Sequence, residues 1–268
     1  MGKFDGVLLA TDFDDTFYSA TQTVHPRNLE RVEYFKANGG TFTVATGRAH
    51  RTFLPYLDIA RPNAPVVLSN GAQLYDFDRD VMVLETCLPD TVRADLENLT
   101  GRLPELGLEA YHNEEVYIWN PNPWTWFHLN RAHTGATECA IADMPQPWGK
   151  AILLQDHELL LRAQSLITER WSDRYEAIFS NPNMLELTAR GSTKGSMVLE
   201  LARRLGISRK NVYCVGDTQN DIPMLEVSAV PFAPANCADS VRAWGPTLLP
   251  DCEDGAIACL IDRLDERY

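Results

Sequence analysis

Long hydrophobic runs are missing from this sequence of 268 residues. No stretch approaches the roughly 18 consecutive apolar residues that a membrane-spanning helix requires. The amino-terminal segment, MGKFDGVLLATDFDD, contains neither the apolar core nor the cleavage site of a signal peptide. We therefore expect no membrane partner and a cytoplasmic location.

Basic residues are outnumbered, with 24 Lys and Arg against 37 Asp and Glu, which gives a formal net charge of −13. A general nucleic-acid footprint requires the opposite sign of charge, so no nucleic-acid partner is expected. The six cysteines form no CxxC pair and the six histidines no HExxH motif. The cysteine pattern is typical of a reduced, cytosolic protein, and no zinc site is expected from the histidines.

Apolar runs alternate with helical patterns in the first third of the chain. Runs at Val7–Ala10, Thr41–Ala45 and Pro65–Leu68 indicate strands, and the first ends abruptly in carboxylates. Helical spacing covers Pro26–Asn38, and residues 49–58 can form a second helix. This alternation is typical of an α/β fold, with a Rossmann-like, doubly wound parallel sheet.

The pattern changes after about residue 82, where proline and tryptophan become frequent. Five of the six tryptophans fall between residues 119 and 171. Strand-like and helical segments are mixed there, at 90–100, 116–119, 124–133, 150–154, 157–171, 175–179 and 184–187. The earlier pattern resumes with a helix at 196–205, a strand at 212–215 and a helix at 222–227. We therefore predict a discontinuous core, residues 1–82 and 189–268, that holds an inserted α+β domain at 83–188.

Four polar motifs follow predicted strands or begin predicted helices: DFDDT at 12–16, TGR at 46–48, KG at 194–195 and GDTQND at 216–221. In order and spacing they resemble the motifs of the haloacid dehalogenase (HAD) superfamily of phosphatases. The insert and the SNGA sequence at 69–72 resemble the Cof-like branch, which carries a large α/β cap of type C2. The resemblance implies that residues 83–188 form this cap domain.

The resemblance assigns the chemistry to three residues. Asp12, whose ordinary pKa of about 3.9 leaves it ionised at neutral pH, would attack phosphorus and form an aspartyl-phosphate. Asp14 would act as general acid and base. Lys194 would supply positive charge to the nucleophile and to a phosphate oxygen.

Two anions meet in such a reaction, and they repel by about 4 kcal/mol at 4 Å in a medium of dielectric 20. A cation is needed, and Mg²⁺ prefers oxygen ligands. The resemblance implies Mg²⁺ held by Asp12, by the main-chain carbonyl of Asp14 and by Asp217. Asp221 would orient Lys194 or a metal-bound water.

The resemblance also implies a set of phosphate- and substrate-binding groups. They are the main-chain N–H groups of Phe13 and Gly47, and the side chains of Thr46, Arg48, Asn70, Lys194 and Asn220. Within the insert, Trp124, Trp126, His128, Arg131 and Lys150 are candidates for contact with substrate.

Asp15 departs from the family pattern, which usually has glycine at this position. Aspartate tolerates the left-handed conformation of such a turn better than most residues. We expect Asp15 to keep the turn and to add negative charge close to Asp14, which favours the acid role of Asp14.

The sequence therefore predicts a Mg²⁺-dependent phosphatase acting on a small phosphorylated metabolite, such as a sugar phosphate. A phosphomutase would use the same aspartyl-phosphate, and a non-catalytic regulator would bind the metabolite without turnover. The four intact motifs weigh against the regulator, because a sensor has no need of a nucleophile and an acid together. The natural substrate and the oligomeric state are not encoded in these motifs.

Overall fold

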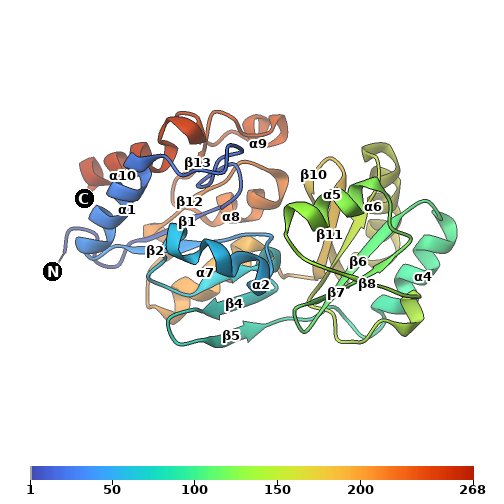
Figure 1. Cartoon of the computed structure of the whole chain (residues 1–268). Coiled ribbons are helices and arrows are strands. Elements are labelled where there is room, and N and C mark those ends of the chain that lie inside the picture. Colours follow the sequence, from blue (N-terminus) through green and yellow to red (C-terminus); the bar gives the residue numbers. More distant parts are fainter. Residues whose placement is uncertain (1) are drawn as a thin grey trace. The chain divides into compact units, whose positions relative to one another are not determined.

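The computed structural model describes residues 2–268 (Figure 1). By their contacts the described residues fall into two units: residues 2–47, Pro55–Leu84 and Thr193–Tyr268 form the first, and Arg48–Leu54 and Glu85–Ser192 form the second. The predicted α/β fold class is confirmed. The cap boundaries at 83–188 stay a prediction. Within residues 2–268 no helix combines the length and the apolar character needed to cross a membrane.

The first unit is built on a five-stranded parallel sheet with the strand order β14-β13-β12-β1-β2. The central strand, β1, pairs with β12 and β2, so that Leu8 lies between Val212 and Thr41. Every residue of β1 is buried, as expected for a strand covered on both faces. The strand bounds are β1 Leu8–Thr11, β2 Thr41–Val44, β12 Val212–Val215, β13 Pro231–Ala233 and β14 Thr247–Leu248.

Helices cover this sheet. α1 and α10 lie side by side (Figure 1). Buried side chains of α7 and α8 cluster with Leu8 and Ala10 of β1, which point to one face of the sheet. The helix bounds are α1 Pro26–Ala37, α3 Leu57–Ala60, α7 Lys194–Arg204, α8 Ile222–Val227, α9 Asp239–Trp244 and α10 Ala256–Arg267.

The segment after β2 departs from the simple alternation. The helix predicted at 49–58 is broken into α2 (His50–Phe53), a 3₁₀ turn (Leu54–Tyr56) and α3. Pro55 lies at the break and lacks the N–H that a continuous helix would use. The strand predicted at 65–68 is present as β3 (Val66–Leu68), joined to the parallel sheet by one bridge, Ala45 to Val67. It continues into an antiparallel sheet with β4 (Gln73–Asp76) and β5 (Val81–Glu85).

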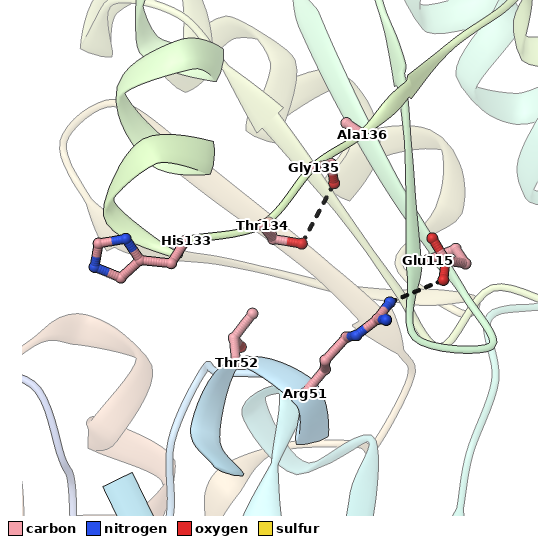
Figure 2. A pocket seen from close by; sticks show the side chains of 7 residues that line it. All are labelled: Arg51, Thr52, Glu115, His133, Thr134, Gly135 and Ala136. Carbon is pink, nitrogen blue, oxygen red and sulfur yellow. Dashed lines mark hydrogen bonds and ion pairs between the residues drawn. The ribbon is translucent and has the colours of Figure 1, made fainter. Parts of the chain in front are cut away.

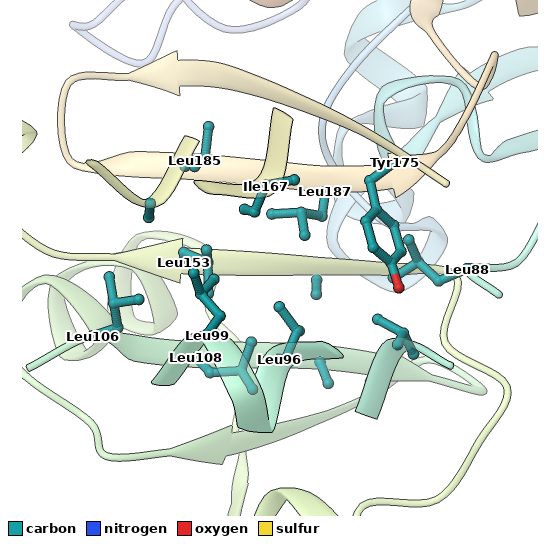
Figure 3. Packing of buried hydrophobic residues seen from close by; sticks show 14 of the residues in the cluster. Leu88, Leu96, Leu99, Leu106, Leu108, Leu153, Ile167, Tyr175, Leu185 and Leu187 are labelled. Atoms are coloured by element: carbon teal, nitrogen blue, oxygen red, sulfur yellow. The ribbon is translucent and has the colours of Figure 1, made fainter. Parts of the chain in front are cut away.

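The second unit contains a six-stranded, mostly antiparallel sheet with the order β10-β11-β9-β6-β7-β8. Buried residues of α4 and α6 form one hydrophobic cluster with side chains of this sheet (Figure 3). Trp148 lies fully buried in the cluster, so at least this tryptophan serves packing. The bounds are β6 Gly107–His112, β7 Glu115–Trp119, β8 Thr137–Glu138, β9 Lys150–Leu154, β10 Tyr175–Asn181, β11 Met184–Ala189, α4 Val92–Arg102, α5 Pro123–Arg131 and α6 His157–Trp171.

Helix α6 shows how the sequence directs this packing. Asp156 caps its first turn by accepting the N–H of Leu159. Its buried residues, Leu160, Ala163, Ile167 and Trp171, recur at the three- and four-residue spacing of one helix face. Burial of each large side chain contributes roughly 1.5–3 kcal/mol.

Candidate active site

Two motifs meet at the carboxyl edge of the parallel sheet. Because β1 and β12 pair in parallel, with Thr11 opposite Val215, both strands end at the same edge. The N–H of Asp12 donates to the carbonyl of Val215 at 2.9 Å, which continues the pairing by one residue. Asp217 lies two residues beyond β12, and both carboxylates are buried. Loops at this edge of an open α/β sheet are where such folds bind ligands.

Lys194 joins the two motifs from the first position of α7. Its Nζ lies 2.6 Å from Oδ1 of Asp12 and 2.6 Å from Oδ1 of Asp221, and the side chain is 1% exposed. The helix start is fixed by Thr193, which forms a capping box with Ser196. Gly195 permits close packing here, since a Cβ at this position would lie 2.0 Å from the carbonyl oxygen of Pro223.

Asp221 uses both of its carboxylate oxygens. While Oδ1 accepts from Lys194, Oδ2 accepts the main-chain N–H groups of Asp217 at 2.9 Å and Thr218 at 3.0 Å. Gly216 leaves room for this carboxylate, because a Cβ at Gly216 would lie 2.4 Å from Cγ of Asp221. The side chain thus ties Lys194 to the loop that carries Asp217.

Thr16 is a contact that sequence reasoning missed. Its hydroxyl donates to Oδ1 of Asp217 at 2.9 Å, and Thr16 is fully buried. The only signal in the sequence is that Thr16 is the last residue of the DFDDT motif, which marks the residue but does not reveal its partner. The contact links the loop after β1 to the loop after β12.

Three buried carboxylates, those of Asp12, Asp217 and Asp221, bring ligand oxygens within 4.8 Å of one another. Burial raises the pKa of Asp12 to about 7, with Lys194 opposing and Asp221 adding to the effect. Burial also raises the pKa of Asp217, and the charges of Asp12 and Asp221 raise it further. When they are ionised, three carboxylates carry more negative charge than one ammonium balances, and hard oxygen donors of this kind fit a divalent cation such as Mg²⁺.

Asp14 and Asp15 lie in the turn after β1. Asp14 is half-buried and forms an isolated bridge with Tyr18. Asp15 has a φ of 62°, so the expected left-handed turn is confirmed. Its N–H donates to the carbonyl of Tyr18 at 2.7 Å, and its carbonyl accepts Nδ2 of Asn236 at 2.8 Å. Asn236 was not singled out from the sequence, and the effect of the Asp15 charge on Asp14 stays a prediction.

The predicted phosphate-binding residues divide between the two units. Thr46 is buried in the first unit, and its N–H donates to the carbonyl of Val67 at 2.9 Å. Gly47, the next residue, is the last of its segment in that unit. Arg48 belongs by its contacts to the second unit, where its guanidinium donates to the carbonyl of Thr52 at 3.3 Å. The phosphate contact of Arg48 stays a prediction.

Phe13, Asn70 and Asn220 lie in the first unit with Asp12. Nδ2 of Asn220 donates to Oδ1 of Asn70 at 3.0 Å, so the structure brings these two predicted residues together. Phe13 is buried, and its ring stacks on that of Tyr18 with a centroid distance of 5.1 Å.

Two residues of the second unit that the sequence suggested as substrate-binding pair with carboxylates. Nζ of Lys150 lies 3.0 Å from Oε2 of Glu186, and Nδ1 of His128 lies 2.8 Å from Oε2 of Glu109. Trp124 and Trp126 are exposed on α5, and nothing in the structure assigns them a ligand.

A separate cavity of about 500 Å³ lies within the second unit (Figure 2). Arg51 and Glu115 line it and pair with each other at 2.8 Å, so their charges are mutually compensated. The cavity contains none of the predicted catalytic or metal-binding residues. Its other lining residues are Thr52, His133, Thr134, Gly135 and Ala136.

Known proteins resemble the chain over nearly its whole length. Pyridoxal phosphate phosphatase YbhA of Escherichia coli is 23% identical over 96% of this chain and 97% of its own. The HMP-PP phosphatase of Serratia proteamaculans is 24% identical over 94% of this chain and 92% of its own. The structure of the sugar phosphatase BT4131, of HAD subclass IIB, superposes with a TM-score of 0.85 at 18% identity, over 97% of this chain and 99% of the other.

The structural similarity to BT4131 shows the fold of the chain. Residues 9–261 match the family described as haloacid dehalogenase-like hydrolase, a span that includes all four sequence motifs. The chain belongs to the haloacid dehalogenase-like hydrolases, as its motifs predicted.

Proposed function

We propose that the protein is a Mg²⁺-dependent phosphatase that hydrolyses a small phosphate monoester through an aspartyl-phosphate on Asp12. The observation that carries the proposal is the buried cluster in which Lys194 contacts both Asp12 and Asp221 while Asp217 lies beside them. A buried carboxylate paired with a buried ammonium is costly to maintain, so its presence favours a chemical role.

Asp12, Asp217 and the main-chain carbonyl of Asp14 would hold the Mg²⁺. Bound there, the metal would neutralise negative charge on the carboxylates and on the phosphate, allowing the two anions to approach. The Thr16 hydroxyl donates to the carboxylate of Asp217, and the carboxylate of Asp221 accepts the N–H of Asp217. Through these bonds Thr16 and Asp221 would hold the loops that present the metal ligands.

Lys194 would assist the nucleophile. Burial alone would lower the pKa of Lys194, but the carboxylates of Asp12 and Asp221 raise it above its ordinary value. The ammonium therefore stays charged, and it would pull Asp12 into place and neutralise a phosphoryl oxygen during attack.

Asp14 would supply and then accept the proton. In the first step it would protonate the leaving alkoxide, and in the second it would take a proton from the water that hydrolyses the acyl-phosphate. The hydroxyl of Thr46, the guanidinium of Arg48 and the N–H groups of Phe13 and Gly47 would donate hydrogen bonds to the phosphoryl oxygens.

The substrate would be a small soluble metabolite, in keeping with the pyridoxal phosphate, HMP-PP and sugar phosphatases to which the chain is similar. Residues 83–188 would form a cap that selects the part of the substrate away from the phosphate. The six free cysteines agree with a reducing, cytoplasmic location.

Turnover of p-nitrophenyl phosphate tests the proposal. We expect hydrolysis that requires Mg²⁺, is abolished by EDTA, falls to background in Asp12→Asn and drops by about 10²- to 10⁴-fold in Asp14→Asn. Asp78→Asn, an exposed aspartate in the turn between β4 and β5, is the matched control and should match the wild type. Full activity in Asp12→Asn, or activity without metal, contradicts the mechanism.

The alternative of a phosphomutase is distinguished by the fate of a labelled phosphoryl group. If the label appears on a sugar hydroxyl and is not released as inorganic phosphate, the protein is a phosphomutase.

A further inference from the structure

The loop after β13 begins at the same sheet edge as the loop that carries Asp217. β13 pairs in parallel with β12, with Phe232 opposite Val215, so residues 234–238 follow a strand that ends at this carboxyl edge. The N–H of Ala238 donates to the carbonyl of Asp217 at 2.8 Å. The loop therefore contacts the main chain of a predicted metal ligand, although it lies outside the four sequence motifs.

Asn236, in the middle of this loop, uses both ends of its side-chain amide. Its Nδ2 donates to the carbonyl of Asp15 at 2.8 Å, and its Oδ1 accepts the N–H of Cys252 at 3.0 Å. The backbone beside it is also held, because the N–H of Ala235 donates to the carbonyl of Pro250 at 3.2 Å. Asn236 thus presents its donor to Asp15 from a loop that other contacts already fix.

Asp15 is a residue whose backbone needs support. Its φ of 62° lies in the left-handed region, which is unfavourable for residues other than glycine. Within the turn, the N–H of Asp15 donates to the carbonyl of Tyr18 at 2.7 Å, and the N–H of Tyr18 donates to the carbonyl of Phe13 at 2.8 Å. The carbonyl of Asp15 is held from outside the turn, by Asn236. Each of the two peptide units that flank Asp15 therefore has a partner that fixes its orientation.

These two peptide units are joined directly to groups that the proposed mechanism uses. Because a peptide unit is planar, the unit that contains the N–H of Asp15 also contains the carbonyl of Asp14. The other unit leads to Thr16, whose hydroxyl donates to Oδ1 of Asp217 at 2.9 Å. A change of the Asp15 backbone out of the left-handed region would therefore turn the Asp14 carbonyl and move the Asp14 side chain. Glycine would adopt this conformation without steric cost, so the aspartate makes support from outside the turn more important.

We propose that Asn236 is a positioning residue that holds the left-handed turn at Asp15 and thereby places Asp14 for proton transfer to the leaving group. The inference rests on the proposed phosphatase function, and it adds a residue from a loop outside the four motifs. Asn236 does not contact the substrate in this proposal, since it acts through the carbonyl of Asp15.

Two substrates with different leaving groups separate this role from a merely structural one. p-Nitrophenolate is a weak base and leaves with little help from an acid, whereas the more basic phenolate of phenyl phosphate depends on the general acid. We compare kcat/KM, which covers departure of the leaving group and excludes the later hydrolysis of the aspartyl-phosphate. Asn236→Ala should lower kcat/KM for phenyl phosphate by about 3- to 10-fold, the effect of one hydrogen bond, and that for p-nitrophenyl phosphate by less. A fall that is not larger with phenyl phosphate overturns the proposal.

Asn236→Asp separates the two bonds of the side chain. Its carboxylate can still accept the N–H of Cys252 but cannot donate to the carbonyl of Asp15. It should therefore lower kcat/KM for phenyl phosphate at least as much as Asn236→Ala does. Wild-type activity in Asn236→Asp would assign the role of Asn236 to its bond with Cys252, which contradicts the proposal.

Asn211→Ala is the matched control. The side chain of Asn211 also donates to a main-chain carbonyl, that of Gly6 at 3.2 Å, but Asn211 lies just before β12, at the amino edge of the same sheet. This variant should keep the wild-type kcat/KM for both substrates. A selective loss with phenyl phosphate in Asn211→Ala would show that the effect does not depend on the bond to Asp15, and would overturn the proposal.

Glycine at position 15 should rescue the loss of Asn236. Because glycine needs no support in the left-handed region, Asn236→Ala should lower kcat/KM for phenyl phosphate by at most about 2-fold in the Asp15→Gly background. Asp15→Asn removes the same charge but keeps a side chain, so Asn236→Ala should cost more in that background. Equal losses in the two backgrounds contradict the proposal.

The two proposals fail in different ways. Wild-type protein that does not turn over p-nitrophenyl phosphate refutes the phosphatase function itself. If Asp14→Asn lowers kcat/KM no more for phenyl phosphate than for p-nitrophenyl phosphate, Asp14 is not the general acid and the proposed mechanism is wrong. If Asp14→Asn shows the selective loss and Asn236→Ala does not, only the positioning role of Asn236 is refuted.

Discussion

Lys194 and Asp221 form a fully buried ion pair in which Nζ lies 2.6 Å from Oδ1. The second oxygen of Asp221 accepts two main-chain N–H groups, those of Asp217 and Thr218. The pair thus joins the start of α7 to the loop after β12, two segments that carry different sequence motifs. Breaking a buried pair leaves one charge uncompensated, so this contact has consequences for both stability and activity.

Asp221→Asn should lower both the stability and the activity of the protein. An asparagine that keeps an oxygen toward Lys194 turns its NH₂ group toward two N–H donors, and about 1–3 kcal/mol is lost for each buried N–H left unsatisfied. We expect a fall of about 3 kcal/mol or more in the free energy of unfolding, measured by urea denaturation, together with reduced kcat. Asp78→Asn serves again as the exposed control. Unchanged stability would show that the loop rearranges to satisfy these groups.

Thr16→Val should act through the metal. The hydroxyl that donates to Asp217 is lost while the shape of the side chain is kept. Removal of a group that orients a ligand typically costs about 10- to 100-fold in metal affinity. We expect the Mg²⁺ concentration for half-maximal activity to rise in this range, with kcat at saturating Mg²⁺ changed less. Thr16→Ser keeps the hydroxyl and should restore most of the affinity; failure of serine to do so would assign the effect to packing.

Gly195→Ala tests the close approach between α7 and α8. The new Cβ would lie 2.0 Å from the backbone oxygen of Pro223, which no side-chain movement can relieve. Overpacking of this kind typically costs about 1–3 kcal/mol. Gly101→Ala, in α4, meets nothing within 4 Å and should instead stabilise the protein by about 1 kcal/mol. Thermal denaturation of the two variants should therefore shift Tm in opposite directions.

The stability of the metal-free protein should depend on the Asp12 carboxyl. Its pKa is raised by burial from 3.8 to about 7, so between these values the native state holds a proton that the unfolded chain has released. The Asp12 contribution to stability therefore falls as pH rises through this window. In EDTA, Asp12→Asn should gain Tm relative to the wild type between pH 4 and pH 7. Because carboxylates bind metal when deprotonated, the rise in wild-type Tm caused by Mg²⁺ should grow over the same window. A Tm difference between the variants that does not change with pH contradicts this account.

The sequence predicted the elements that carry strong periodic or motif signals. β1, β2, β12 and α6 lie where their apolar patterns placed them. β13 and β14 were missed because they have only three and two residues, and α9 was missed because Val241 is its single buried residue, so none of them shows an apolar run or period. α10 was not predicted, although its buried residues recur at the spacing of one helix face.

The candidate active site was also only partly predictable from the sequence. The family resemblance of the motifs implied that Asp12, Lys194 and Asp217 act together, and the structure brings their side chains into one buried cluster. The resemblance gave no indication of Thr16 donating to Asp217 or of Asn236 holding the carbonyl of Asp15, since both bonds depend on how loops fold over one another. Nor did it reveal that Asn70 retains a donor without a partner, which only the packed structure shows.

The assignment of Arg48–Leu54 to the second unit limits how the protein can be cut and recombined. The chain passes between the units at four places, after Gly47, Leu54, Leu84 and Ser192. A chimaera that exchanges only the long segment for that of a relative would separate α2 from Glu114, whose carboxylate accepts the N–H of Arg51 at 2.9 Å. Grafts that exchange the second unit between relatives should therefore carry both segments.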